Sequence, residues 1–322
     1  MTDWQALIDL MKSGSVPALS RLITLVENRT QGWRDIMAEI SFSTGNAVTV
    51  GITGYPGSGK SSLTGRLAKE LAERGKRVGI IAVDPSSHLS GGAFLGDRVR
   101  MNEISSLKNV YIRSMGSRGV AGGIHQPARD VARILDAFGK DYILVETVGT
   151  GQDEINIARS TQVVVLVCAP GQGDSIQYLK AGILEIADIY AANKSDLPEA
   201  EKMLNHLKSM VIHGQESGRN NIPIVKTSAL RGEGVSALAD EIDKKVSDPE
   251  KRDARLRQLA TEEVKALFME GLSRLAERHW SENAQLSAAM DDLMDKRIDP
   301  YLLSDKLIAE SLTYMLKMHA SS

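Results

Sequence analysis

The sequence has 322 residues, of which 42% are hydrophobic, and its 39 basic and 41 acidic side chains give a net charge of −2. This length and apolar content predict a folded chain with a packed core and exclude a disordered one. The near-balance of charge argues against a general nucleic-acid binder and a membrane-surface binder, so neither nucleic acid nor a membrane is expected as a partner.

Helical periodicity covers the first 45 residues, where Trp4, Leu7, Ile8 and Met11 share one helical face. From residue 46 short, nearly continuous apolar runs alternate with helical stretches. The expected strands are 47–52, 78–83, 110–112, 142–146, 162–168, 187–192 and 222–227. The expected helices between them are 60–74, 126–138, 175–185, 197–213 and 234–246. Such alternation predicts an α/β fold, a mostly parallel sheet with helices on both faces.

Strand signals end near residue 248, where a long amphipathic stripe begins, and a second helical segment is expected over about 301–317. We therefore divide the chain into an N-terminal helical extension (1–45), an α/β domain (46–247) and a C-terminal helical segment (248–322). The apolar stripe of the last segment would either cover a core or form the surface of a homodimer.

Cysteine content and the N-terminus bear on the compartment. The single cysteine, Cys168, excludes an internal disulfide and a cysteine metal site within one chain. Residues 1–4 do not start a basic region followed by an apolar stretch, and the longest apolar run, 163–170, is too short to span a bilayer. We therefore expect a cytoplasmic protein.

The stretch G-Y-P-G-S-G-K-S at 54–61 matches G-x-x-x-x-G-K-[ST] in full, after an expected strand and before an expected helix. In such a loop the backbone N–H groups surround phosphate oxygens, Lys60 reaches the β- and γ-phosphates, and the Ser61 hydroxyl binds Mg²⁺. The alternative is a glycine-rich turn with an incidental lysine. We expect a P-loop NTPase fold that binds a nucleoside triphosphate through Gly54, Tyr55, Pro56, Gly57, Ser58, Gly59, Lys60, Ser61 and Ser62.

The sequence N-K-S-D at 193–196 follows another expected strand and bears on the base. The Asp196 carboxylate would accept hydrogen bonds from N1–H and the exocyclic amine of guanine, a donor pair that adenine lacks, while the Lys194 stem would lie along the base. Backbone N–H groups of T-S-A-L at 227–230 would meet the guanine carbonyl. The alternative is a solvated polar turn. The expected base contacts are Asn193, Lys194, Asp196, Ser228, Ala229 and Leu230.

Acidic residues near the ends of two expected strands are candidates for the metal. Asp84 and Glu146 would bind Mg²⁺ directly or through water, and Asp97 would complete the metal shell. Gly149 would bond the γ-phosphate through its N–H, and Gln152 is a candidate for positioning the attacking water. For each acid the alternative is a strand-end cap or a surface ion pair.

Four motifs, V-D-P-S-S at 83–87, G-D-R-V-R-M at 96–101, E-T-V-G-T-G-Q at 146–152 and N-K-S-D at 193–196, occur in the order seen in the MeaB/ArgK-type GTPases. The chain resembles this family of methylmalonyl-CoA mutase-associated GTPases, which includes the human cobalamin A-type protein, over nearly its whole length.

The resemblance implies a homodimeric GTPase that escorts an adenosylcobalamin-dependent acyl-CoA mutase, gates its cofactor loading and helps to clear damaged cofactor. It implies slow hydrolysis that the mutase stimulates, with adenosylcobalamin held only by the partner. Metal and catalytic roles would carry over to Asp84, Asp97 and Glu146, and phosphate roles to Lys60 and Ser61.

A loop that resembles the family's mutase-contacting loop departs from the family pattern. Members often carry G-D-[DE]-[LI]-Q-G-I-K-K-G, whereas residues 173–182 read G-D-S-I-Q-Y-L-K-A-G. The difference leaves GTP binding untouched and leaves the mutase open, so a relative acting on a different acyl-CoA would fit.

Two alternatives use the same phosphate loop. A metallochaperone GTPase of the nickel-insertion kind usually needs Cys or His ligands, and this chain has one Cys and six scattered His. A metabolic kinase needs an acceptor pocket and usually prefers ATP, which N-K-S-D opposes.

Overall fold

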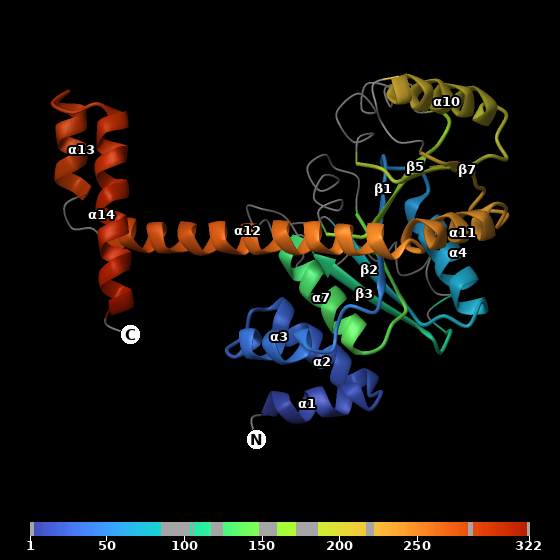
Figure 1. The fold of residues 1–322 in the computed structure, drawn as a ribbon, viewed down its shortest axis with the longest axis horizontal. Coiled ribbons are helices and arrows are strands. Elements are labelled where there is room, and N and C mark those ends of the chain that lie inside the picture. Colours follow the sequence, from blue (N-terminus) through green and yellow to red (C-terminus); the bar gives the residue numbers. More distant parts are fainter. Residues whose placement is uncertain are drawn as a thin grey trace. The chain divides into compact units, whose positions relative to one another are not determined.

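The fold is known from a computed structural model that describes residues 3–84, 104, 106–116, 125–147, 160–171, 186–216, 222–282 and 286–320. Its strands are β1 (Val48–Thr53), β2 (Val78–Asp84), β3 (Val110–Gly116), β4 (Tyr142–Glu146), β5 (Val163–Cys168), β6 (Ile189–Ala192) and β7 (Ile224–Lys226). Its helices are α1 (Asp3–Lys12), α2 (Val16–Glu27), α3 (Trp33–Ser41), α4 (Lys60–Glu73), α7 (His125–Ala137), α10 (Ala200–Glu216), α11 (Val235–Val246), α12 (Pro249–Glu282), α13 (Leu286–Met294) and α14 (Pro300–Ala320) (Figure 1).

The strands form one seven-stranded sheet in the order β3-β2-β4-β1-β5-β6-β7, and every neighbouring pair is parallel. The predicted α/β fold and all the predicted strands are confirmed, with ends that shift by a few residues. β4 and β5 are buried along their whole length, as expected for central parallel strands covered on both faces. Of the predicted helices, 175–185 lies outside the described residues.

Alternate residues of the strands face two different hydrophobic cores because side chains of a strand alternate between its faces. One core joins Ile52 and Leu144 of the sheet to α4 and α11. The opposite core joins Ile143 and Val145 to α7 and the N-terminal helices α1, α2 and α3 (Figure 1). A smaller cluster packs α10 against β5 and β6. Helices therefore cover both faces of the sheet, as predicted.

The chain divides into two compact units, residues 1–259 and 260–322, and the division falls within α12. The second unit holds the rest of α12 with α13 and α14; the sequence did not single out α13 as an element. Among the described residues, no helix combines the length and apolar character that crossing a membrane requires.

Candidate nucleotide-binding site

The predicted phosphate and base motifs lie at one edge of the sheet. The loop 54–59 follows β1, Asn193 follows β6, and Thr227 follows β7. Because all strands are parallel, their carboxyl ends share this edge. In open α/β sheets, ligands bind outside the carboxyl ends of the strands. The topology therefore brings together motifs that are more than 100 residues apart in the sequence.

Two glycines in the phosphate loop occupy positions where a side chain has no room. Gly54 has φ 142°, and a Cβ there would lie 2.2 Å from the main-chain oxygen of Val167 on β5. Gly59 has φ 92°, and its Cβ would lie 2.5 Å from Nδ2 of Asn193. Both backbone conformations favour glycine. The glycines thus let the loop approach β5 and the Asn193 side chain closely.

Lys60 begins α4, and only 6% of its surface is exposed. Its ammonium donates to the main-chain oxygens of Gly54 at 2.7 Å and Tyr55 at 3.2 Å, so the side chain reaches back across the loop. The first N–H groups of a helix lack acceptors inside the helix and carry partial positive charge. Ammonium and helix N-terminus together make this loop suited to bind an anion.

The hydroxyl of Ser61 donates to Oε1 of Glu146 at 2.5 Å. Glu146 ends β4 and is 6% exposed, and its neighbours across the sheet are Ile52 of β1 and Ala82 of β2. Asp84 ends β2 two residues beyond Ala82, at the same edge. A hydroxyl and a carboxylate oxygen are the ligand types that Mg²⁺ prefers, so Ser61 and Glu146 fit this ion. Within the described residues no three His, Cys, Asp or Glu side chains group together as a metal site.

Asn193 joins the phosphate loop to the base motifs. Its amide donates to the main-chain oxygen of Ser58 at 2.9 Å, and its carbonyl accepts from the Ala229 N–H at 3.1 Å and the Thr227 hydroxyl at 3.3 Å. The side chain is 1% exposed, so these are buried hydrogen bonds. One side chain therefore ties three predicted segments together.

Asp196 lies beside the second base motif. The Ser228 hydroxyl donates to its Oδ1 at 2.6 Å. This hydrogen bond holds the pKa of Asp196 below its usual value, so the group is a carboxylate at neutral pH. Lys194 has φ 57°, a left-handed backbone conformation that is uncommon for a residue other than glycine. The carboxylate is partly exposed and is free to meet a base at this edge.

Several predicted site residues lie outside the description. Asp97, Gly149 and Gln152 fall in 85–103 and 148–159, so their roles stay predictions, as does the loop comparison over 173–182. For Asp84 only the backbone is described. Cys168 is buried, and burial raises the pKa of its thiol to about 12, which agrees with an inert packing role.

Sequence reasoning missed Arg66 on α4. Its guanidinium donates through Nε to the main-chain oxygen of Ala229 at 3.0 Å and through Nη2 to that of Leu230 at 3.3 Å. No sequence motif marks this residue; only its place within α4, on the side facing 229–230, brings it to the base loop.

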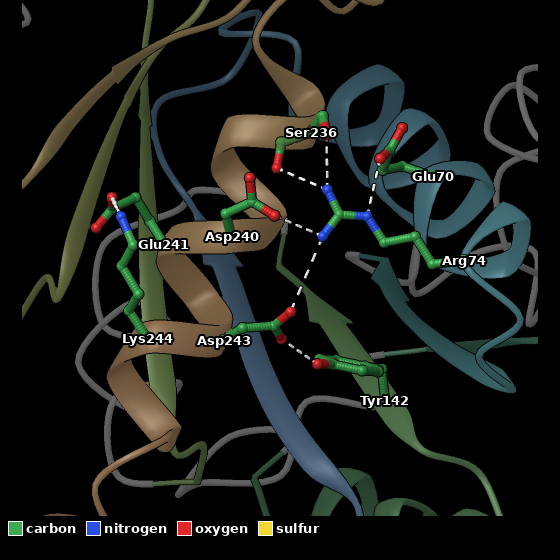
Figure 2. Close-up of polar contacts among 8 residues, drawn as sticks. All are labelled: Glu70, Arg74, Tyr142, Ser236, Asp240, Glu241, Asp243 and Lys244. Atoms are coloured by element: carbon green, nitrogen blue, oxygen red, sulfur yellow. Dashed lines mark hydrogen bonds and ion pairs between the residues drawn. The ribbon is translucent and has the colours of Figure 1, made fainter.

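The far end of α4 is held by a second arginine. Figure 2 shows Arg74 between α4 and α11, where it donates to Glu70 of its own helix and to Asp240 and Ser236 of α11. The Tyr142 hydroxyl donates to Asp243 in the same cluster. This network fixes the helix that follows the phosphate loop against the helix that follows the base loop.

Residues 19–283 match the family described as Methylmalonyl Co-A mutase-associated GTPase MeaB. A putative GTPase of Pyrococcus abyssi is 40% identical over 311 residues, which cover 94% of this chain and 95% of that protein. The mitochondrial methylmalonic aciduria type A homolog of Mus musculus is 36% identical over 195 residues, 59% of this chain and 47% of that protein.

A solved structure of LAO/AO transport system kinase aligns with a TM-score of 0.65 at 22% identity and covers 95% of this chain and 96% of that one. At this identity the likeness shows the fold.

Proposed function

Because the chain belongs to the MeaB family of methylmalonyl-CoA mutase-associated GTPases, we propose that it binds GTP at the edge described above and hydrolyses it with Mg²⁺. The observation that carries the proposal is the joint placement of the phosphate loop and the Asp196 carboxylate through Asn193. The spacing of the two motifs is thereby fixed by buried hydrogen bonds.

Each end of the nucleotide has a partner of matching chemistry. The backbone N–H groups at the start of α4 and the Lys60 ammonium would hold the phosphates. Asp196 would accept from N1–H and the amine of guanine, and adenine would leave this carboxylate unpaired. A site with such a hydrogen-bonding carboxylate discriminates strongly between the two bases.

Magnesium would be held by Ser61 and Glu146, with Asp84 and Asp97 completing its surroundings. When bound, the ion would neutralise charge on the β- and γ-phosphate oxygens. The Glu146 carboxylate already lies on the Ser61 hydroxyl and so orients it toward the same point. Gly149 and Gln152 are the proposed γ-phosphate contact and water-positioning residue.

We further propose that hydrolysis acts as a timer for an adenosylcobalamin-dependent acyl-CoA mutase, methylmalonyl-CoA mutase or a relative. The protein would gate loading of the cofactor and protect or reactivate the mutase, and adenosylcobalamin would be held by that partner alone. Family membership supports this partner class. Because the loop 173–182 departs from the family pattern, the acyl-CoA of the partner is left open.

Residues 248–322 would form a homodimer surface. Large apolar side chains are exposed on the helices of the second unit: Val264, Phe268, Met269, Trp280, Met294, Tyr301, Leu302, Ile308 and Leu312. Exposed apolar side chains in such number are typical of surfaces that bind another protein. Sedimentation of the purified chain would test this, since a monomer at micromolar concentration contradicts it.

Nucleotide turnover with and without mutase tests the main proposal. GTP should bind far more tightly than ATP, and its slow hydrolysis should accelerate when a mutase that rearranges the matching acyl-CoA is added. Lys60→Ala, which removes the phosphate-binding ammonium, is the control for contaminating hydrolysis. Equal affinity for ATP would refute the nucleotide assignment. Unchanged turnover with every adenosylcobalamin-dependent acyl-CoA mutase would refute the partner assignment.

A further inference from the structure

Arg66 uses its guanidinium on two consecutive carbonyl groups of the base loop. Nε donates to the oxygen of Ala229 and Nη2 to that of Leu230, and the side chain forms no ion pair with any described residue. The planar guanidinium presents its donors in a fixed arrangement, so it holds two acceptors at a set separation. An arginine without an acidic partner is therefore placed against backbone that the proposed base contacts share.

The first carbonyl fixes the direction of an N–H group. Peptide units are planar and trans, and none in the described chain is cis. The C=O of Ala229 and the N–H of Leu230 belong to one such unit and point in opposite directions. Because Arg66 holds the oxygen, the Leu230 N–H points away from α4. Its direction is set before any nucleotide arrives.

The second carbonyl leads to the carboxylate. The C=O of Leu230 shares a peptide unit with the N–H of Arg231, which donates to Oγ of Ser228 at 3.3 Å. The Ser228 hydroxyl in turn donates to Oδ1 of Asp196 at 2.6 Å. A chain of contacts thus runs from Arg66 through one peptide unit and one hydroxyl to Asp196.

We propose that Arg66 is a positioning residue that sets guanine selectivity from the phosphate-loop helix. It holds the peptide N–H of Leu230 and, through Ser228, the carboxylate of Asp196 in the orientation that guanine needs. This inference rests on the proposed guanine site. Preorganised donors and acceptors raise affinity because binding no longer has to order them.

Affinities of the full-length protein for GDP, ADP and pyrophosphate test the proposal in wild type, Arg66→Ala and Arg66→Lys. In Arg66→Ala, GDP affinity should fall about tenfold, the scale of one lost hydrogen bond, while affinities for ADP and pyrophosphate stay within about twofold. Arg66→Lys keeps one donor for one carbonyl, so its loss for GDP should be about threefold.

Arg74→Ala is the matched control. Arg74 is on the same helix and also ties α4 to α11, but it contacts Ser236 and Asp240 and no residue of 228–231. It should lower thermal stability and leave the ratio of GDP to ADP affinity unchanged.

The outcomes separate the possibilities. A selective loss of GDP affinity in Arg66→Ala, partly restored in Arg66→Lys, supports positioning. A parallel loss for all three probes, or no loss, overturns it, because a merely structural role would affect phosphate binding equally. If wild type itself fails to prefer GDP over ADP, the proposed guanine site fails instead, and that result is seen without any variant.

Discussion

Ser61 and Glu146, 85 residues apart in the sequence, are joined by a hydrogen bond of 2.5 Å from the serine hydroxyl to Oε1 of the glutamate. The bond connects the start of α4 to the end of β4. A buried carboxylate at the start of a phosphate-binding helix has one evident use, since it supplies an oxygen ligand for a divalent ion beside the phosphates. The relationship therefore predicts the consequence of removing the charge while keeping the shape.

Glu146→Gln should lower Mg²⁺-dependent GTP hydrolysis by about 100-fold, because the amide can still accept from Ser61 but no longer provides a negative charge for the ion. GDP affinity measured without Mg²⁺ should change by less than about twofold. Hydrolysis over a range of Mg²⁺ concentrations is the measurement. Glu70→Gln, which alters a carboxylate of the same helix bound to Arg74, is the control and should hydrolyse GTP normally. Full activity in Glu146→Gln at low Mg²⁺ would contradict the assignment.

Asp196→Asn should shift the base preference toward xanthine. The asparagine amide donates where guanine also donates, whereas xanthine offers a carbonyl oxygen at that place. The retained oxygen still accepts from the Ser228 hydroxyl, so the loop geometry should survive. GTP affinity should fall about 100-fold and XTP affinity should rise, as competition binding of the two nucleotides would report. An unchanged preference for GTP would show that Asp196 does not face the base.

Asn193→Ala should lower both stability and nucleotide affinity. The substitution leaves the Ser58 carbonyl and the Ala229 N–H without their partner at a buried position. Each such group costs about 1–3 kcal/mol, so unfolding free energy should drop by about 2–4 kcal/mol, and GDP affinity should fall about tenfold or more.

Asn109→Ala is the control for that variant, because Asn109 also bonds main-chain oxygens, those of Ala72 and Lys76, at the far end of α4. Denaturation curves and GDP titrations of both variants separate the effects. Asn109→Ala should be destabilised with normal GDP affinity. If Asn193→Ala also binds GDP normally, Asn193 is not the link between phosphate loop and base loop.

The sheet and its motifs were predictable because the signals are local. Buried parallel strands need continuous apolar runs, and the phosphate loop needs glycine where φ is positive, so both leave marks in short stretches of sequence. The strands from Val48 to Lys226 and the loop at 54–61 were found in this way. Asn193 and Asp196 were found because their spacing in N-K-S-D is local too.

Contacts between distant segments leave no such mark. Arg66 was missed since an arginine on an amphipathic helix is usual, and its carbonyl acceptors lie 163 and 164 residues further along the chain. The bond from Ser61 to Glu146 depends likewise on strand order, which places β4 beside β1. Sequence spacing suggested that both residues serve the metal, and only the topology brings them into contact.

Lys140→Met should raise stability at neutral pH. Lys140 is 6% exposed, and burial, helped by the positive charge of Arg77, lowers the pKa of its ammonium to about 8. An unfolded lysine has a pKa of about 10.4, so between about pH 8 and 10 the unfolded chain binds more protons than the folded one. Folding stability therefore rises with pH across this window, and below pH 8 the cost of burying the charge is present in full.

In Lys140→Met this cost is absent at every pH, so the variant should be more stable than wild type at pH 7, and the difference should shrink toward pH 10. The Asn109 carbonyl that accepts from Lys140 keeps its bond from the Val78 N–H, so no buried acceptor is left unsatisfied. Urea unfolding at several pH values from 7 to 10 gives the comparison, with Lys76→Met at an exposed neighbouring position as control. A difference between Lys140→Met and wild type that stays constant over this range would show that the Lys140 ammonium is not destabilised by burial.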